Sequence, residues 1–444
     1  MRSVFRGKGQ AFDLAQAVQS GRHVMTKVPQ PEWTEVATTT RFRRKVFYIP
    51  GYDPFPPRRY RELFRKESAD QAKVSGYAVA LTPRHGRDGY GWHATARIDG
   101  CLAVADFEVL VWSDIVRTSM SAGIGATYLQ LLRTAWAYIG SGALMRLMRL
   151  RKGPMIAALY PIVALMLELG IALGLGWAAA EGLGAASRAI GADGPAATWA
   201  GLAGALAVIW GALWLFRRQD KRIFAWYLMH DYAFTARFGG ANPPALETRM
   251  AEFGARIGGA MDEDWDEVLV IGHSSGAHLA ISILADLVRG GRGRARGAKL
   301  AFLSLGQVVP MVSFLPGAER LRADLGFLSE RSELTWVDVT APGDGCAFAL
   351  CDPVAVSGMA GPAKIWPLVI SAAFSQNLSP QRWRALRWHF FRLHFQYLCA
   401  FDQPGGFDYF AITAGPLTLA ERYAGRAPSA SRIETPHNRF GRFR

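Results

Sequence analysis

The most chemically suggestive stretch of the sequence is Gly272-His273-Ser274-Ser275-Gly276. It matches the pattern G-x-S-x-G, in which the central serine is a nucleophile that attacks acyl groups. The bare pattern is weak evidence, because so short a motif often occurs by chance. Its surroundings strengthen it, since an apolar run of strand length precedes it at residues 267–271 and a helical pattern follows at 275–288. We therefore expect Ser274 on a sharp strand-to-helix turn, with the Ser275 N–H placed to bind a developing oxyanion.

The elements that must position this serine alternate along the chain. Apolar runs predict strands at residues 45–49, 77–81, 92–98, 104–112, 267–271, 299–304 and 333–339, the third and fourth as a β-ribbon or as further sheet strands. Helices are predicted at about 58–67, 245–257 and 275–288. Continuous apolar strands separated by helices are typical of a mostly parallel sheet with helices on both faces, which is the α/β class.

Two long apolar segments interrupt this pattern. Residues 153–180 contain a single charged residue, Glu168, and residues 195–216 contain none. Each segment is long enough to cross a bilayer, so we expect an inserted transmembrane helical hairpin. A carboxylate that faced lipid would be costly, so Glu168 is expected to face the partner helix, another subunit or a polar cavity.

Basic residues mark both ends of this hairpin. They are Arg146, Arg149, Arg151 and Lys152 before the first span and Arg217, Arg218, Lys221 and Arg222 after the second. The connecting loop has only Arg188 against Glu181 and Asp193. By the positive-inside rule, this bias places both termini and the catalytic domain in the cytoplasm. The first 25 residues lack the apolar run of a secretory signal, which agrees with a protein of the inner or cell membrane.

The composition and charge of the chain limit which classes of partner and cofactor are expected. The 444 residues include 51 Lys and Arg against 36 Asp and Glu, so the formal net charge is 51 − 36 = +15. Much of this charge lies in the tails, beside the spans and at residues 289–299, without interleaved aromatic residues that would stack on bases. We therefore expect membrane lipids as partners and no nucleic acid. Four cysteines without a C-x-x-C pair, and the absence of H-E-x-x-H, P-loop and dinucleotide motifs, predict neither metal nor cofactor.

With these elements in place, the sequence resembles the α/β-hydrolase superfamily of serine lipases and esterases. The resemblance covers roughly residues 44–120 and 220–420, and its most specific part is IGHSSGAHLA. It implies an α/β-hydrolase-like sheet and an oxyanion hole whose second N–H follows an early strand. VFYIPGYDP occupies that place, so Gly51 or Tyr52 would donate alongside Ser275. The segment departs from the usual His-Gly pair of the family.

The resemblance also implies a triad in the chain order Ser, acid, His. Asp344, in APGDG directly after the strand at 333–339, occupies the expected place for the acid. Asp338 inside that strand and Asp352 further along remain alternatives.

The base of the triad is expected in the segment RWHFFRLHFQYL. His389 and His394 lie five residues apart there, so on one helix they would point to different faces. We favour His394, because Asp402 and the turn QPGGFDY follow it as if this segment lined the sheet edge. His437 is set aside because it lies in the C-terminal tail, and His273 and His278 are expected to pack or orient.

These predictions divide the chain into five parts. They are an N-terminal tail (1–40), the first part of the α/β core (41–145), the transmembrane hairpin (146–222), the second part of the core with the nucleophile turn (223–425) and a basic C-terminal tail (426–444). The oligomeric state is left open.

The favoured function is a membrane-anchored serine hydrolase that cleaves an ester or thioester, with a lipid or acyl substrate, through an acyl-enzyme. Acyl transfer would use the same residues. The alternative is a catalytically silent α/β-hydrolase-like membrane protein that binds lipid or a partner. A transport role for the hairpin is disfavoured, because two spans cannot enclose a pathway without oligomerising.

Overall fold

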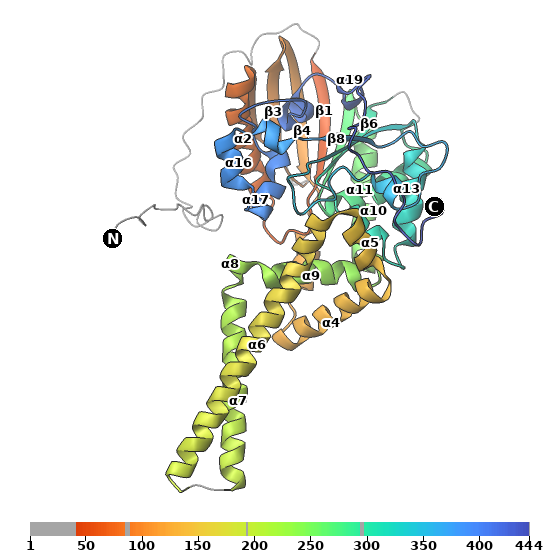
Figure 1. Cartoon of the computed structure of the whole chain (residues 1–444). Helices are drawn as coiled ribbons and strands as arrows, with labels where there is room; N and C mark the ends of the chain where they lie inside the picture. The colour runs from red at the N-terminus through yellow and green to blue at the C-terminus, as the bar shows by residue number, and fades with distance from the viewer. Residues whose placement is uncertain (1–40, 85–88, 192–193, 294–296, 444) are drawn as a thin grey trace. The chain divides into compact units, whose positions relative to one another are not determined.

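The computed structural model describes residues 41–84, 89–191, 194–293 and 297–443, so the expected N-terminal tail lies outside it. The strands of the described part are β1 (Phe42–Ile49), β2 (Ala78–Pro83), β3 (Tyr90–Ile98), β4 (Cys101–Val109), β5 (Glu267–His273), β6 (Lys299–Leu305), β7 (Leu334–Thr340) and β8 (Leu368–Ser371). They form one sheet of order β2-β3-β4-β1-β5-β6-β7-β8 (Figure 1). Neighbouring strands are parallel except where β3 pairs antiparallel with β2 and β4. The predicted α/β class is confirmed, and β3 with β4 forms the predicted ribbon.

The central strands are apolar throughout because both of their faces are covered. All seven residues of β5 are buried. Val268 and Val270 belong to the core on one face, whereas Leu269 and Ile271 belong to the core on the other, as the two-residue period of a strand requires.

Helices from distant parts of the chain supply the other half of each core. The first core contains side chains of α2 (Arg58–Ser75), α15 (Phe374–Asn377), α16 (Pro380–Leu386), α17 (Phe390–His394), the 3₁₀ helix η2 (Gln396–Leu398), α18 (Tyr409–Ala414) and α19 (Leu419–Arg422). The second contains side chains of α3 (Ser113–Ser119), α10 (Pro244–Met261), α11 (Gly276–Arg289), α12 (Val309–Ser313), α13 (Glu319–Ser329) and α14 (Pro353–Val356). The expected arrangement of helices on both faces is therefore present.

A separate set of helices lies between β4 and β5 in the chain. It consists of α4 (Ile124–Gly140), α5 (Ala143–Leu150), α6 (Lys152–Ala189), α7 (Pro195–Arg218), α8 (Asp220–Ile223) and α9 (Ala225–Ala236). Among the described helices, α6 and α7 are long and apolar enough to cross a membrane, and they lie side by side (Figure 1). Only 28% and 17% of the residues in their most apolar 18-residue windows are buried, which distinguishes them from core helices of a soluble protein.

The base of this hairpin packs against the rest of the protein through α9. Leu165 and Ala172 of α6 and Leu213 of α7 share an apolar cluster with Met229 of α9. Glu168 accepts a hydrogen bond from the indole N–H of Trp226 at 3.0 Å, so this carboxylate faces α9.

Residues 426–443, expected to form a basic tail, run along the core and are hydrogen-bonded to it at several points, although Asn438 is the only one of them that is buried. Ile433 pairs with Cys351 in a parallel bridge, and its N–H donates to the Leu350 carbonyl at 2.7 Å. The buried Asn438 donates its amide to the Ser313 carbonyl at 2.8 Å. The basic composition of this segment concealed the few apolar and amide side chains that attach it.

Candidate active site

The turn between β5 and α11 holds Ser274 in a strained conformation. Ser274 has a φ of 56°, which is uncommon for a residue with a Cβ and is characteristic of functional turns. Its N–H donates to the Leu305 carbonyl at 2.9 Å, which attaches the turn to the end of β6. A Cβ at Gly272 would lie 2.6 Å from the Cα of Ala277, and one at Gly276 would lie 2.1 Å from the Ile49 carbonyl oxygen. Close approach of backbone therefore explains both glycines of the motif.

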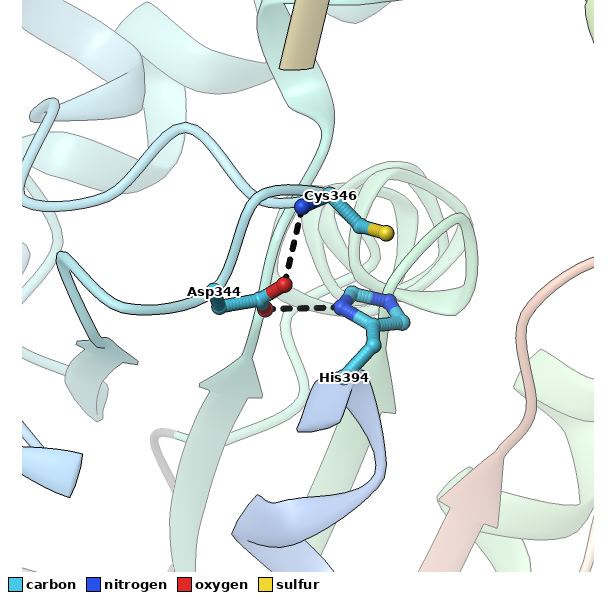
Figure 2. Close-up of side chains that lie close together, drawn as sticks. All are labelled: Asp344, Cys346 and His394. Carbon is cyan, nitrogen blue, oxygen red and sulfur yellow. Dashed lines mark hydrogen bonds and ion pairs between the residues drawn. The ribbon is translucent and has the colours of Figure 1, made fainter. Parts of the chain in front are cut away.

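Asp344 and His394 meet in a buried hydrogen bond. Asp344 follows β7 and His394 ends α17, and their Oδ2 and Nδ1 atoms lie 2.7 Å apart (Figure 2). The same carboxylate accepts the Tyr397 hydroxyl at 3.0 Å and the Cys346 N–H at 2.9 Å. Burial alone would raise the pKa of Asp344, but the charge of His394 and these hydrogen bonds outweigh it and hold the pKa below its ordinary value. Asp344 is therefore an ionised carboxylate that orients His394.

The imidazole of His394 lies beside the serine turn. Its Cε1 is 3.1 Å from the position that a Cβ on Gly306 would take, and Gly306 follows Leu305, the residue that accepts the Ser274 N–H. The Nε2 atom is buried and has no hydrogen-bond partner within the described residues. With Nδ1 bound to Asp344, this nitrogen is the one available to exchange a proton.

His273 supports His394 from the adjacent position of the turn. The two rings have centroids 4.9 Å apart, and His273 Nε2 donates to the His394 carbonyl at 3.1 Å. Burial lowers the pKa of His273 to about 3, so this ring is neutral near pH 7. The expectation that His273 orients a neighbour agrees with these contacts.

The alternative acids and the alternative base have other partners. Asp338 lies inside β7 and is hydrogen-bonded to the Ser304 hydroxyl. Asp352 caps α14 and pairs with Lys364 at 2.7 Å. His389 is exposed just before α17. The structure brings together the favoured pair, and it brings none of these three residues to the Asp344–His394 bond.

The loop after β1 packs directly against the serine. A Cβ on Gly51 would lie 3.0 Å from the Cβ of Ser274 and 3.4 Å from its Oγ. In the part of the chain that the structure describes, no acceptor takes the backbone N–H of Gly51, Tyr52 or Ser275. The three predicted oxyanion donors are thus unoccupied donors close to Ser274.

Several contacts fix this loop in place. The Trp112 indole donates to the Pro50 carbonyl at 2.9 Å, and the Tyr227 hydroxyl donates to the Tyr52 carbonyl. Asp53 accepts the Phe55 N–H at 2.9 Å and pairs with Arg59 at 3.1 Å. A loop held at so many points is suited to a preorganised site.

Three residues near the pair were not predicted from the sequence. Tyr397 and Cys346 contact Asp344, as described above. Asp231 of α9 interacts electrostatically with His394, and burial raises its pKa to about 7 although the charge of His394 opposes this. The sequence offered one feature that could have predicted Tyr397 at the site, its spacing of about one helical turn from His394. No sequence feature pointed to Asp231, which follows the hairpin.

The Asp344–Cys346–His394 group includes atoms that can bind metals, all within 4.8 Å of one another. A zinc ion would need its ligands about 2.0–2.3 Å away. The hydrogen bond between His394 Nδ1 and Asp344 Oδ2 already uses one atom of each residue, so the arrangement suits an oriented base better than a metal site. Burial, with Asp344 and Asp231 nearby, raises the pKa of Cys346 well above its ordinary value, so its thiol is a poor nucleophile.

No family model, curated protein or solved structure matched the chain. The function of the site must therefore be inferred from its own residues and contacts.

Proposed function

We propose that the protein is a membrane-anchored serine hydrolase that cleaves an ester or thioester of an acyl-chain substrate at the cytoplasmic membrane surface. The observation that carries this proposal is the buried Asp344–His394 hydrogen bond beside the strained Ser274 turn, with Nε2 of His394 unpaired among the described residues. An activated serine needs these three functions: a nucleophile, a base and an orienting carboxylate.

In the proposed reaction, Nε2 of His394 takes the hydroxyl proton as Ser274 Oγ forms a bond to the acyl carbon. The carbonyl π bond breaks and its electron pair moves to the carbonyl oxygen. The N–H groups of Ser275 and of Gly51 or Tyr52 stabilise the resulting oxyanion. When the tetrahedral intermediate collapses, His394 returns the proton to the departing alcohol or thiol. Water then repeats these steps on the acyl-enzyme, releasing the carboxylic acid and restoring Ser274.

Two features support action at a membrane. The first is the exposed apolar hairpin of α6 and α7. The second is α4, whose Leu129, Leu132, Trp136 and Ile139 are 46–78% exposed and follow a spacing of three, four and three residues. That spacing puts them on one helical face, as in helices that lie in the headgroup region of a bilayer. A cleft beside these elements would meet lipidic substrates at high local concentration.

The experiment that tests the proposal is labelling of the detergent-solubilised full chain with a fluorophosphonate, which reacts with activated serines. We expect the wild type to label, Ser274→Ala not to label and His394→Ala to label at least about 100-fold more slowly. His389→Ala is the matched control and should label like the wild type, because His389 is exposed and outside the site.

A folded wild-type protein that does not label would contradict the hydrolase proposal. The silent lipid-binding or partner-binding role would then become the better description. Equal slowing by His389→Ala and His394→Ala would also contradict the assignment of the base.

A further inference from the structure

A cleft adjoins the candidate active site on the side of Asp344. It has a volume of about 640 Å³ and is formed by α5, the first turn of α6 and the loop after β7. Asp344 and Gly345 of that loop line it directly. Its volume lies within the range of small-molecule sites, so it can hold a headgroup or a comparable polar group.

The charged lining of this cleft is mostly basic. Arg149, Arg151 and Lys152 line it, and Asp344 is its acidic residue. Asp344 already accepts hydrogen bonds from His394, Tyr397 and Cys346, so these three donors compensate the negative charge of its carboxylate. An anion in this cleft would therefore face three cations.

The three cations differ in how they are held. Arg151 donates from Nε to the Ala349 carbonyl at 2.8 Å, which fixes its guanidinium at the wall. Arg149 and Lys152 are exposed, and the structure pairs neither with a carboxylate within the described residues. Such unpaired cations around a concave surface can engage a phosphate by charge-assisted hydrogen bonds.

The cleft also has an apolar side that continues toward the hairpin. Met145 is 56% exposed and Met148 is 36% exposed, and both line it. Flexible methionine side chains suit contact with an acyl or glycerol portion next to the anion. Since Lys152 and Gly153 begin the first membrane-spanning helix, the cleft lies where that helix leaves the proposed catalytic domain.

From these observations we propose that the cleft binds the phosphate of a phosphate-bearing acyl ester or thioester and thereby selects the substrate of the site. The proposal rests on the hydrolase function proposed above. The phosphate belongs either to a membrane phospholipid or to a soluble acyl thioester with a phosphorylated leaving group, and the chemistry of recognition is the same for both.

Basic residues beside a membrane span can also serve only to orient the span. The test must therefore separate cations of the cleft from cations that merely flank the membrane. Arg133 of α4 and Arg218 of α7 are exposed and lie outside the cleft lining, so the double variant Arg133→Gln/Arg218→Gln removes the same charge without touching the cleft.

The first measurement is binding to the full-length Ser274→Ala protein, which removes turnover. The probes are dihexanoyl phosphatidate, hexanoyl-coenzyme A and, as the neutral reference, dihexanoylglycerol. We expect one or both phosphate-bearing probes to bind more tightly than the neutral one. Arg149→Gln/Lys152→Gln should weaken that binding by at least about tenfold, whereas Arg133→Gln/Arg218→Gln should not. Which phosphate probe binds identifies the source.

The second measurement separates this proposal from the hydrolase function. In proteins that retain Ser274, kcat/KM is measured for the phosphate-bearing ester or thioester that bound and for p-nitrophenyl hexanoate. The ratio of kcat/KM for the phosphate-bearing substrate to kcat/KM for p-nitrophenyl hexanoate should fall about tenfold in Arg149→Gln/Lys152→Gln. It should stay near the wild-type value in Arg149→Lys, a variant that keeps the charge and so checks for effects on folding. Wild-type turnover of p-nitrophenyl hexanoate reports the hydrolase function independently of the cleft.

Two results would overturn the cleft proposal while leaving the hydrolase intact. One is equal weakening of phosphate binding by the cleft and flank double variants, which would indicate general membrane charge. The other is hydrolysis of p-nitrophenyl hexanoate together with no preference for either phosphate probe. Phosphate binding without any turnover would instead overturn the hydrolase function, on which the substrate role of the cleft depends.

Discussion

At the scale of single residues, the site depends on the hydrogen bonds that protein groups donate to the buried carboxylate of Asp344. Asp344 accepts three hydrogen bonds, from an imidazole, a phenol and a backbone N–H. These contacts replace the water that burial removes and keep the carboxylate charged. A carboxylate held in this way can fix the tautomer of His394 and, in the proposed reaction, would stabilise the imidazolium formed when Ser274 loses its proton.

Replacing Asp344 by Asn should preserve the shape of the site and remove this function. We expect Asp344→Asn to slow fluorophosphonate labelling by roughly 10³- to 10⁴-fold, because the amide favours the wrong imidazole tautomer. Tyr397→Phe removes only one of the three donors and should slow labelling by about tenfold. Stopped-flow or time-resolved gel labelling measures both rates. An Asp344→Asn protein that labels as fast as wild type would exclude Asp344 as the acid.

A second buried carboxylate gives a stability prediction. Burial raises the pKa of Asp338 to about 8, with the nearby Asp352 adding to the effect and the Ser304 hydroxyl opposing it. In the unfolded chain an Asp has a pKa of about 3.9. Between about pH 4 and pH 8 the unfolded state therefore loses a proton that the folded state retains, so folded-state stability falls as pH rises through this window.

We expect Asp338→Asn to reduce the loss of thermal stability between pH 5 and pH 8. Asp231, whose pKa is raised to about 7, contributes a loss of the same sign and remains in the variant. The unfolding midpoint in detergent at the two pH values is the measurement. An unchanged difference between pH 5 and pH 8 would show that Asp338 is not protonated in the folded protein.

At the scale of elements, the site is made by four chain segments that converge on one edge of the sheet. The turn after β5 carries Ser274, the loop after β1 carries Gly51, the loop after β7 carries Asp344 and α17 carries His394. Because β1, β5 and β7 run in the same direction, their carboxyl ends and following loops lie at the same edge. Helix α9 covers this edge through the Tyr227–Tyr52 contact.

The close packing of Gly51 on the serine gives a test at this scale. We expect Gly51→Ala to slow fluorophosphonate labelling by about tenfold or more, because the new methyl group would meet the Ser274 side chain at 3.0 Å. The control is Gly125→Ala in the first turn of α4, where an added Cβ has no neighbour within 4 Å. Labelling rate and thermal midpoint are measured for both. Slow labelling with a large loss of stability in Gly51→Ala would point to a folding defect instead.

At the scale of the whole molecule, the hairpin and the α/β part are joined by packing as well as by the chain. Apolar contacts and the Glu168–Trp226 hydrogen bond attach α6 to α9, the helix that covers the site. The same helix α9 contacts the Tyr52 loop through the Tyr227 hydroxyl. By the positive-inside rule, the basic flanks of α6 and α7 predict that the proposed catalytic part lies in the cytoplasm.

This orientation can be tested with two cysteines. Ile190 is 82% exposed at the end of α6, at the far end of the hairpin, and the native Cys101 is exposed at the start of β4. We expect a membrane-impermeant maleimide to label Ile190→Cys in intact cells and Cys101 only after permeabilisation. Wild-type protein in intact cells gives the background. The reverse order of labelling would show that the catalytic part lies outside the cytoplasm.

Local patterns in the sequence were sufficient for many of the elements. The apolar run before GHSSG predicted β5, and the helical pattern after it predicted α11, so the strand-to-helix turn at Ser274 followed from adjacent residues alone. The two long apolar segments, one with a single charged residue and one with none, likewise predicted α6 and α7. Short or amphipathic elements were missed: β8 has only four residues, and α4 carries its exposed apolar face among ordinary helical residues.

The sequence by itself determined the alternation of strands and helices, the strand-to-helix turn at Ser274 and the apolar hairpin, because each depends on residues close together in the chain. Only the tertiary structure decided that Asp344 pairs with His394, 50 residues away, and that Asp338, Asp352 and His389 do not. It also placed Asp231, Tyr397 and the basic cleft around that pair. The physical reason is that hydrophobic periodicity specifies which face of an element is buried, whereas the positions of loop side chains depend on how distant elements pack together.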